Sequence, residues 1–166
     1  MARLFTAIDA VNEWTGRIVG FQIVFIVGVV VYEIVARSLF SKPTLWANET
    51  MVYVTAMAYL LGGGYALLYR RHVIVDVVYQ RLSSRTRGRL DLVTFLFFVF
   101  YMLTLIWVGW VFAWDSVQLR ETAGTPWNPP IYPVKLSIPL AGGLVLLQGL
   151  ANVLRDFYGS RGESGS

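Results

Sequence analysis

The chain has 166 residues, of which 56% are hydrophobic and only 14% are charged, and its formal net charge is +4. Soluble domains carry about 25% charged residues, so this composition argues against a soluble domain. The chain has no cysteine, which excludes disulfides, thiolate metal sites and cysteine nucleophiles, and its single histidine excludes bis-histidine haem ligation within this chain. We therefore expect a protein that is not an enzyme and binds no cofactor.

Four apolar stretches are each long enough to cross a bilayer, whose hydrocarbon core of about 30 Å requires about 20 helical residues. We predict transmembrane helices over about 17–40, 46–69, 91–115 and 136–155. Little of the chain remains outside these spans. The sequence therefore predicts an all-α integral membrane protein that forms a single membrane domain over residues 1–166.

Before the first span, residues 1–16 place Leu4, Ile8, Val11 and Thr15 on one side of a helix. This spacing predicts a short amphipathic helix on the membrane surface, and a frayed terminus is the alternative. The segment lacks the order of a signal peptide, with a basic region, a short apolar core and a cleavage site. We therefore expect the first span to be a permanent anchor.

Ionisable residues at membrane depth are candidates for function, and the first two spans contain few of them. Glu33 and Arg37 are four residues apart near the end of the first span, so their side chains can pair. Trp46 and Glu49 begin the second span at the same membrane boundary. Two interpretations are open: a carboxylate that binds a proton or substrate, or an ion pair that fixes the first hairpin or meets a partner subunit. The absence of charge near the bilayer centre favours the second.

Small residues recur along the second and fourth spans. Ala58, Gly62 and Ala66 are spaced by four residues, and Gly142 and Gly149 lie in the fourth span. Small residues let helices approach closely in lipid. The glycine triplet that begins at Gly62 could instead kink its helix. We favour close packing.

The segment 72–89, between the second and third spans, is too short and too charged to cross the membrane. We predict an interfacial helix in which His72 and Asp76 share one face, while Arg81 and Arg85 point toward lipid headgroups. A β-strand is the alternative, but an unpaired strand beside a bilayer is costly.

Positive residues are distributed unevenly along the chain. Six arginines lie between the second and third spans and others lie near the termini, whereas the opposite side has only Arg37, Lys42, Arg120 and Lys135. Because positive residues favour the cytoplasmic side, we predict that both termini are cytoplasmic. Topology and anionic lipids explain this arginine-rich segment better than nucleic acid does.

The connection between the third and fourth spans is rich in proline. Pro126, Pro130 and Pro133 keep it extended at low entropic cost, so together with Trp127 it is a candidate rigid docking surface on the outer face. We expect the fourth span to start with Pro139 near its first turn, where proline is tolerated.

Three segments, in this order, resemble signatures of the DctQ-like small membrane subunit of tripartite ATP-independent periplasmic (TRAP) transporters. They are YEIVARSLFSKPTLWANE (32–49), HVIVDVVYQRLSSRTR (72–87) and PPIYPVKLSIPLAGGLVLLQGLA (129–151). The similarity covers nearly the whole chain. The chain departs from the family pattern at Ser38, where tyrosine is frequent, and at Asn48, where many members have an acidic residue. The matching residues are Tyr32, Glu33, Arg37, Phe40, Pro43, Thr44, Trp46, Glu49, His72, Val73, Asp76, Leu82, Pro133, Lys135, Pro139 and Gln148.

The resemblance implies a small scaffold subunit of a sodium-coupled importer of organic anions in the bacterial inner membrane. A periplasmic binding protein would deliver the solute to a larger, many-span subunit that moves it by an elevator-like motion. The small subunit would stabilise and anchor that larger one. The alternatives are an autonomous four-helix exporter using Glu33, a membrane anchor of a redox enzyme, and a purely structural interaction protein.

Overall fold

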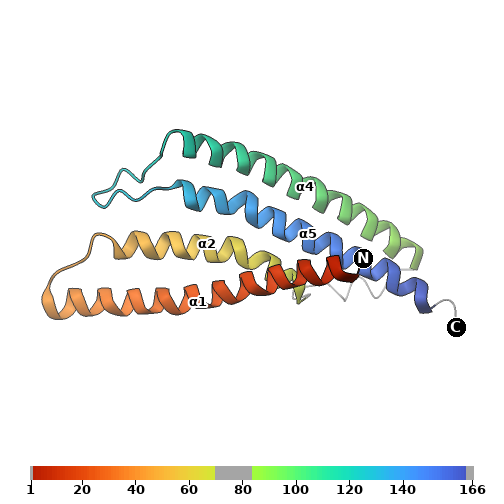
Figure 1. Ribbon diagram of the computed structural model, residues 1–166, viewed down its shortest axis with the longest axis horizontal. Helices are drawn as coiled ribbons and strands as arrows, with labels where there is room; N and C mark the ends of the chain where they lie inside the picture. The colour runs from red at the N-terminus through yellow and green to blue at the C-terminus, as the bar shows by residue number, and fades with distance from the viewer. Residues whose placement is uncertain (1, 70–83, 164–166) are drawn as a thin grey trace.

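The computed structural model describes residues 2–69 and 84–163 and contains four long helices in these ranges (Figure 1). They are α1 (Ala2–Phe40), α2 (Ala47–Leu68), α4 (Ser84–Gln118) and α5 (Tyr132–Glu163). Each helix contains a segment long and apolar enough to cross a membrane. The prediction of an all-α fold with four membrane-spanning helices is therefore confirmed.

The four helices form an open layer rather than a closed bundle. Helix α4 packs against α5, α5 against α2 and α2 against α1, and α1 also touches α5. Figure 1 shows α4 and α1 at the two edges of this layer, with both chain termini at one end. We call this end the terminal end, and the opposite end, which carries the connections 41–46 and 119–131, the loop end.

Few large side chains are buried within the layer. The buried apolar residues are mostly alanines, whereas many valines, leucines and aromatic residues are exposed. Lipid tails are as apolar as leucine, so helices in a membrane associate by close contact between small residues instead of by burying large ones. The exposed apolar surface is therefore the expected surface of a membrane protein.

Local sequence explains where the helices end at the loop end. Helix α1 stops before Ser41, which has a φ of 52°, and Pro43 disfavours helical backbone at the preceding residue. Helix α4 stops before Arg120, which also has a positive φ, of 47°. Helix α5 begins at Tyr132, so Pro133 lies in its first turn, where the missing N–H is not needed.

Three boundaries differ from the sequence prediction. The segment 1–16 is not a separate element, because α1 continues without a break from Ala2, and its placement on the membrane surface stays a prediction. Helix α5 begins before residue 136, which moves Pro139 from the first turn into the interior of the helix. Of the predicted interfacial helix, 72–83 lies outside the described residues and 84–89 forms the start of α4.

Close contact between α4 and α5 depends on glycine. A Cβ atom on Gly109 would meet Ile138 Cγ2 at 2.9 Å and Pro139 Cδ at 3.4 Å. One on Gly142 would meet Ile106 Cγ1 at 2.9 Å. Real Cβ atoms essentially never approach so closely, so these two glycines set the distance between the helices.

Candidate functional site

The carboxylate of Glu33 joins the two sides of the turn between α1 and α2. It accepts a hydrogen bond from Arg37 Nη2 at 2.9 Å on its own helix. It also accepts hydrogen bonds from the backbone N–H of Thr44, at 3.2 Å, and from the Thr44 hydroxyl. Glu33 is only 8% exposed. These bonds link α1 to the turn before α2, and a role of Glu33 in fixing the first hairpin stays a prediction.

The other two predicted residues of this hairpin lie at the start of α2 and differ in their contacts. Trp46, which precedes α2, stacks on Tyr32 with ring centroids 5.7 Å apart, so it also ties α2 to α1. Glu49 lies in the first turn of α2, and its Oε2 is buried without a hydrogen-bond partner among the described residues. Its side chain therefore does not belong to the hydrogen-bonded group around Glu33.

A second group of polar side chains connects three helices toward the terminal end. Asn12 Nδ2 of α1 donates to Gln148 Oε1 of α5 at 2.9 Å, and the two residues are 1% and 0% exposed. Gln148 Nε2 donates to Asp9 Oδ1 at 3.1 Å and to Asn152 Oδ1 at 3.3 Å. Asn152 in turn donates to the carbonyl oxygen of Leu67 in α2 at 3.1 Å.

Charged side chains add further bonds to this network. Arg155 Nη2 donates to Asp9 Oδ2 at 2.6 Å and to the carbonyl oxygen of Phe5 at 3.2 Å. Nearby, the Tyr69 hydroxyl donates to Glu13 Oε2 at 2.7 Å, which links the end of α2 to α1. This bond raises the pKa of Tyr69 to about 12, because it stabilises the neutral phenol. The network therefore holds α1, α2 and α5 together.

The connection between α4 and α5 folds back on itself as a short hairpin. The backbone N–H groups of Ala123 and Ile131 donate to the carbonyl oxygens of Pro129 and Glu121, each at 3.0 Å. At its tip, the backbone N–H of Gly124 donates to Asn128 Oδ1 at 2.9 Å. The connection is therefore paired as well as extended. Of the predicted docking residues here, Pro126, Trp127 and Pro130 are exposed, whereas Pro133 belongs to α5.

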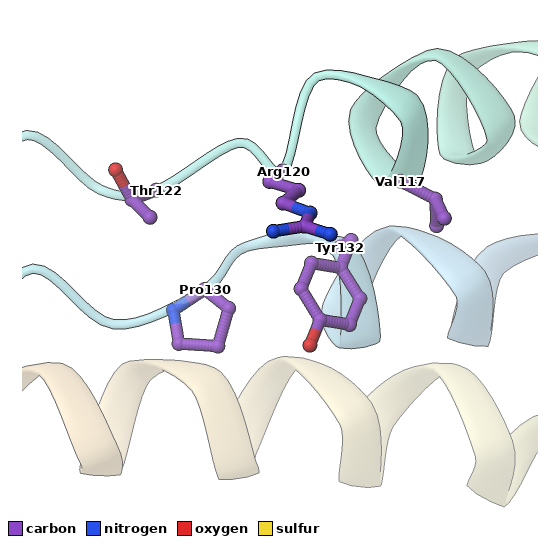
Figure 2. Close-up of a pocket in the computed structure, with 5 residues that line it drawn as sticks. All are labelled: Val117, Arg120, Thr122, Pro130 and Tyr132. Carbon is purple, nitrogen blue, oxygen red and sulfur yellow. The ribbon is translucent and has the colours of Figure 1, made fainter.

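An open pocket of about 510 Å³ lies at the base of this hairpin. Figure 2 shows its five lining side chains, contributed by the end of α4, both arms of the hairpin and the start of α5. The lining residues are Val117, Arg120, Thr122, Pro130 and Tyr132.

An ion pair fixes the hairpin base to α5. Lys135 Nζ donates to Glu121 Oε2, and this contact holds the pKa of Glu121 below its usual value of 4.5. The side chain of Lys135 is mostly buried. The charges of Lys135 and Glu121 therefore neutralise each other.

The predicted packing residues of α2 and α5 face different helices. In α2, Ala58 is buried, and a Cβ on Gly62 would lie 3.9 Å from Val19 Cγ1 of α1, which is ordinary van der Waals contact. In α5, a Cβ on Gly142 or Gly149 would overlap α4 side chains. Ala66 is half-buried.

The four predicted interfacial residues lie in or next to the segment between α2 and α4. His72, Asp76 and Arg81 lie outside the described residues, and Arg85 is the second residue of α4. Their proposed interfacial role stays a prediction.

Sequence reasoning missed the residues of the polar network as a functional group. Asp9, Asn12 and Asn152 were not singled out for a role, and Gln148 was quoted only as part of the family signature. The signal available was their polarity within otherwise apolar segments, which marks membrane residues for attention. No sequence rule pairs residues that are 136 positions apart.

No group of three or more His, Asp and Glu side chains that could hold a metal ion exists among the residues that the structure describes. The polar groups instead bond to one another across helices. Comparison with protein families gives a match over residues 26–159 to the DctQ component of tripartite ATP-independent periplasmic transporters. This match covers well over half of the chain.

The chain belongs to the DctQ family. A search of curated proteins found no match. As a DctQ component, the chain is the small membrane subunit of a TRAP transporter and a multi-pass membrane protein, and the family is not an enzyme family. DctQ proteins function with a large membrane subunit and a periplasmic binding protein in a tripartite system. The match gives no support to the alternative of an autonomous exporter.

Proposed function

We propose that this DctQ protein is the fixed scaffold of a sodium-coupled TRAP importer of organic anions. In this proposal it lies in the bacterial inner membrane with the terminal end in the cytoplasm and the loop end in the periplasm. It stabilises and anchors the large subunit and has no solute site of its own. The observation that carries the proposal is the use of its polar side chains to tie helices together at both ends of the layer.

One cluster of polar side chains at each end of the layer is hydrogen-bonded within the chain. At the loop end, Glu33 bonds to Arg37 and Thr44. Toward the terminal end, Gln148 bonds to residues of α1 and α5. A transporter that moves a charged solute by itself needs free polar groups or broken helices near the middle of the membrane. Groups that are already paired support a structural role.

The exposed apolar side chains of α1 and α4 support the proposal of a large membrane partner. On α1, Phe21 and Val24 are strongly exposed, and on α4 the same is true of Phe97, Phe100 and Trp107. Either edge can lie against lipid or against helices of the large subunit. An elevator-type transporter requires one part to stay still while another slides, and a layer tied at both ends suits the stationary part.

The interfacial residues complete this proposal. Arg81 and Arg85 would contact anionic headgroups on the cytoplasmic side, and His72 and Asp76 would orient the segment between α2 and α4. Basic residues near a membrane surface each contribute about 1 kcal/mol of attraction to anionic lipid. Such contacts would resist vertical movement of the scaffold.

Reconstitution tests the proposal directly. The large subunit is placed in liposomes with an inward sodium gradient and its binding protein, either with or without this chain, and solute uptake is measured. We expect uptake only when both membrane subunits are present, and none from this chain alone. Transport by this chain alone, or full uptake by the large subunit alone, would contradict the scaffold role.

The proposed orientation can be tested with single cysteines, because the natural chain has none. In intact cells, a membrane-impermeant maleimide that reaches the periplasm should label Thr125→Cys and leave Ser160→Cys unlabelled until the inner membrane is opened. The reverse pattern would place the loop end in the cytoplasm.

A further inference from the structure

The pocket at the base of the α4–α5 hairpin contains a cation that the rest of the described chain does not neutralise. Arg120 reaches into this pocket between the hairpin arm and Tyr132 (Figure 2). No carboxylate among the described residues forms an ion pair with its guanidinium. Glu121, the next residue, pairs with Lys135 instead. At the other turn of the loop end, Arg37 is paired with Glu33.

The backbone holds Arg120 in a defined position. Its φ of 47° is left-handed, and its N–H donates to the carbonyl oxygen of Val117 at 3.1 Å. The next two backbone bonds, from Glu121 to Ser116 and from Ile131 to Glu121, fix the start of the hairpin. Because the backbone of this turn is already fixed, a ligand that binds the guanidinium must order only the side chain of Arg120.

Exposed apolar groups accompany this cation on the hairpin side of the membrane span. The α4 span ends at Gln118, and beyond it Leu119 is 78% exposed and Trp127 is 44% exposed. Tryptophan and arginine are enriched at the energetic centres of protein interfaces. An arginine that forms no ion pair among the described residues, on the same connection as these apolar groups, fits a protein partner with an acidic surface.

We propose that the Arg120 pocket is the docking point for an aspartate or glutamate side chain of the periplasmic substrate-binding protein, an inference that rests on the proposed function and orientation. Arginine binds carboxylates through two parallel N–H donors, which gives this contact directional specificity. Arg120, Thr122 and Pro130 are all exposed, so the pocket leaves a small solute largely open to water. An exposed single ion pair contributes little alone, so it is effective only within a larger protein interface.

Binding of the purified binding protein to the complex of this chain with its large subunit, in lipid nanodiscs, tests the inference. We expect Arg120→Glu to weaken binding about tenfold and to reduce its dependence on salt, because a charge-assisted contact is lost. Arg120→Lys should weaken binding less, because lysine keeps the positive charge but lacks the two parallel N–H donors of arginine. The matched control is Lys42→Glu, which makes the same charge change at an exposed residue of the other turn. It should change affinity less than about twofold.

Each other outcome has a distinct meaning. If the binding protein does not bind the unaltered complex, the proposed function itself fails. If it binds and Arg120→Glu has no effect, or weakens binding only as much as Lys42→Glu, the Arg120 pocket is not the docking point. If Arg120→Glu leaves protein binding intact but removes binding of free succinate to the complex, the pocket holds a small anion, and docking at Arg120 is refuted.

Discussion

Replacing Gly64 with alanine is expected to disturb the junction of α1, α2 and α5. A Cβ atom on Gly64 would overlap Asn12 Oδ1 and would lie 3.3 Å from Leu144 Cβ. Asn12 is buried and cannot move aside freely, because its amide nitrogen also donates to Gln148 and, at 3.1 Å, to the carbonyl oxygen of Ile8. The methyl group must therefore displace a side chain that holds two helices together.

The size of the effect follows from three contributions. Inserting a methyl group into a close-packed site costs about 1–3 kcal/mol. Breaking the bond between Asn12 and Gln148 adds about 0.6 kcal/mol, the average for such bonds between membrane helices. Alanine gains about 1 kcal/mol over glycine in a helix. We therefore expect Gly64→Ala to lower the free energy of unfolding by about 1.6 kcal/mol, which is about 15-fold in the equilibrium constant.

Gly62→Ala is the matched control, two residues away on the same helix. A Cβ there would lie 3.9 Å from Val19 Cγ1, which is ordinary van der Waals contact. This variant should be unchanged or up to about 1 kcal/mol more stable, because only the helix preference of alanine acts.

The assay is reversible unfolding of the purified chain by SDS in mixed micelles, followed by tryptophan fluorescence. Adding Asn12→Ala to Gly64→Ala removes the group that the methyl would strike, so the double variant should lose less stability than the two single variants together. Equal stability of Gly64→Ala and Gly62→Ala would refute the reasoning, since it would mean that Asn12 does not lie against Gly64.

Three further predictions use the other polar contacts. Gln148→Leu should lower the free energy of unfolding by about 2 kcal/mol in the same SDS assay, because three hydrogen bonds are lost in a fully buried position; an unchanged midpoint would contradict the network. Glu33→Gln should reduce the amount of large subunit that co-purifies without changing the sodium dependence of uptake by intact complexes, and altered sodium coupling would argue against a purely structural role. The pKa of Glu121 is lowered by Lys135, so its contribution to stability is present above about pH 4.5 and is lost as the pH falls through the lower folded value. In a variant that keeps Trp127 and has phenylalanine at the other tryptophan positions, the fluorescence of Trp127 should change as the pH falls below about 4.5. The same variant with Glu121→Gln should show no such change.

The fold was predictable from sequence because each span carries its own signal. The predicted second span, 46–69, differs from α2 (Ala47–Leu68) by one residue at each end. Residues 2–16 form the start of α1, and the placement of this segment on the membrane surface stays a prediction. Polar residues on one face of a helix fit a membrane surface and a buried network equally well, so the spacing alone does not distinguish the two. The buried amide of Asn12 donates a hydrogen bond to Gln148, and nothing near Asn12 in the sequence indicates this partner.

The packing faces were harder to predict than the helices. Spacing by four residues pointed to Gly62, whereas the neighbouring Gly64 lies against Asn12. Gly16 of α1 was not singled out, yet the ring of Tyr65 covers it so closely that a Cβ would overlap the ring. Whether a glycine meets another helix depends on the rotation of each helix, which the residue pattern of one helix does not fix.

The sequence by itself determined the number of spans and the family, and the tertiary structure decided which polar residues act together. A bilayer imposes its requirement on each segment separately: about 20 apolar residues whose backbone groups bond within their own helix. That information is local and can be read along the chain. Contacts between helices join residues far apart in sequence, through small side chains and single hydrogen bonds that many arrangements would satisfy. Only the tertiary structure shows that Gln148 is buried and hydrogen-bonded across helices, whereas Arg120 is exposed and forms no ion pair among the described residues.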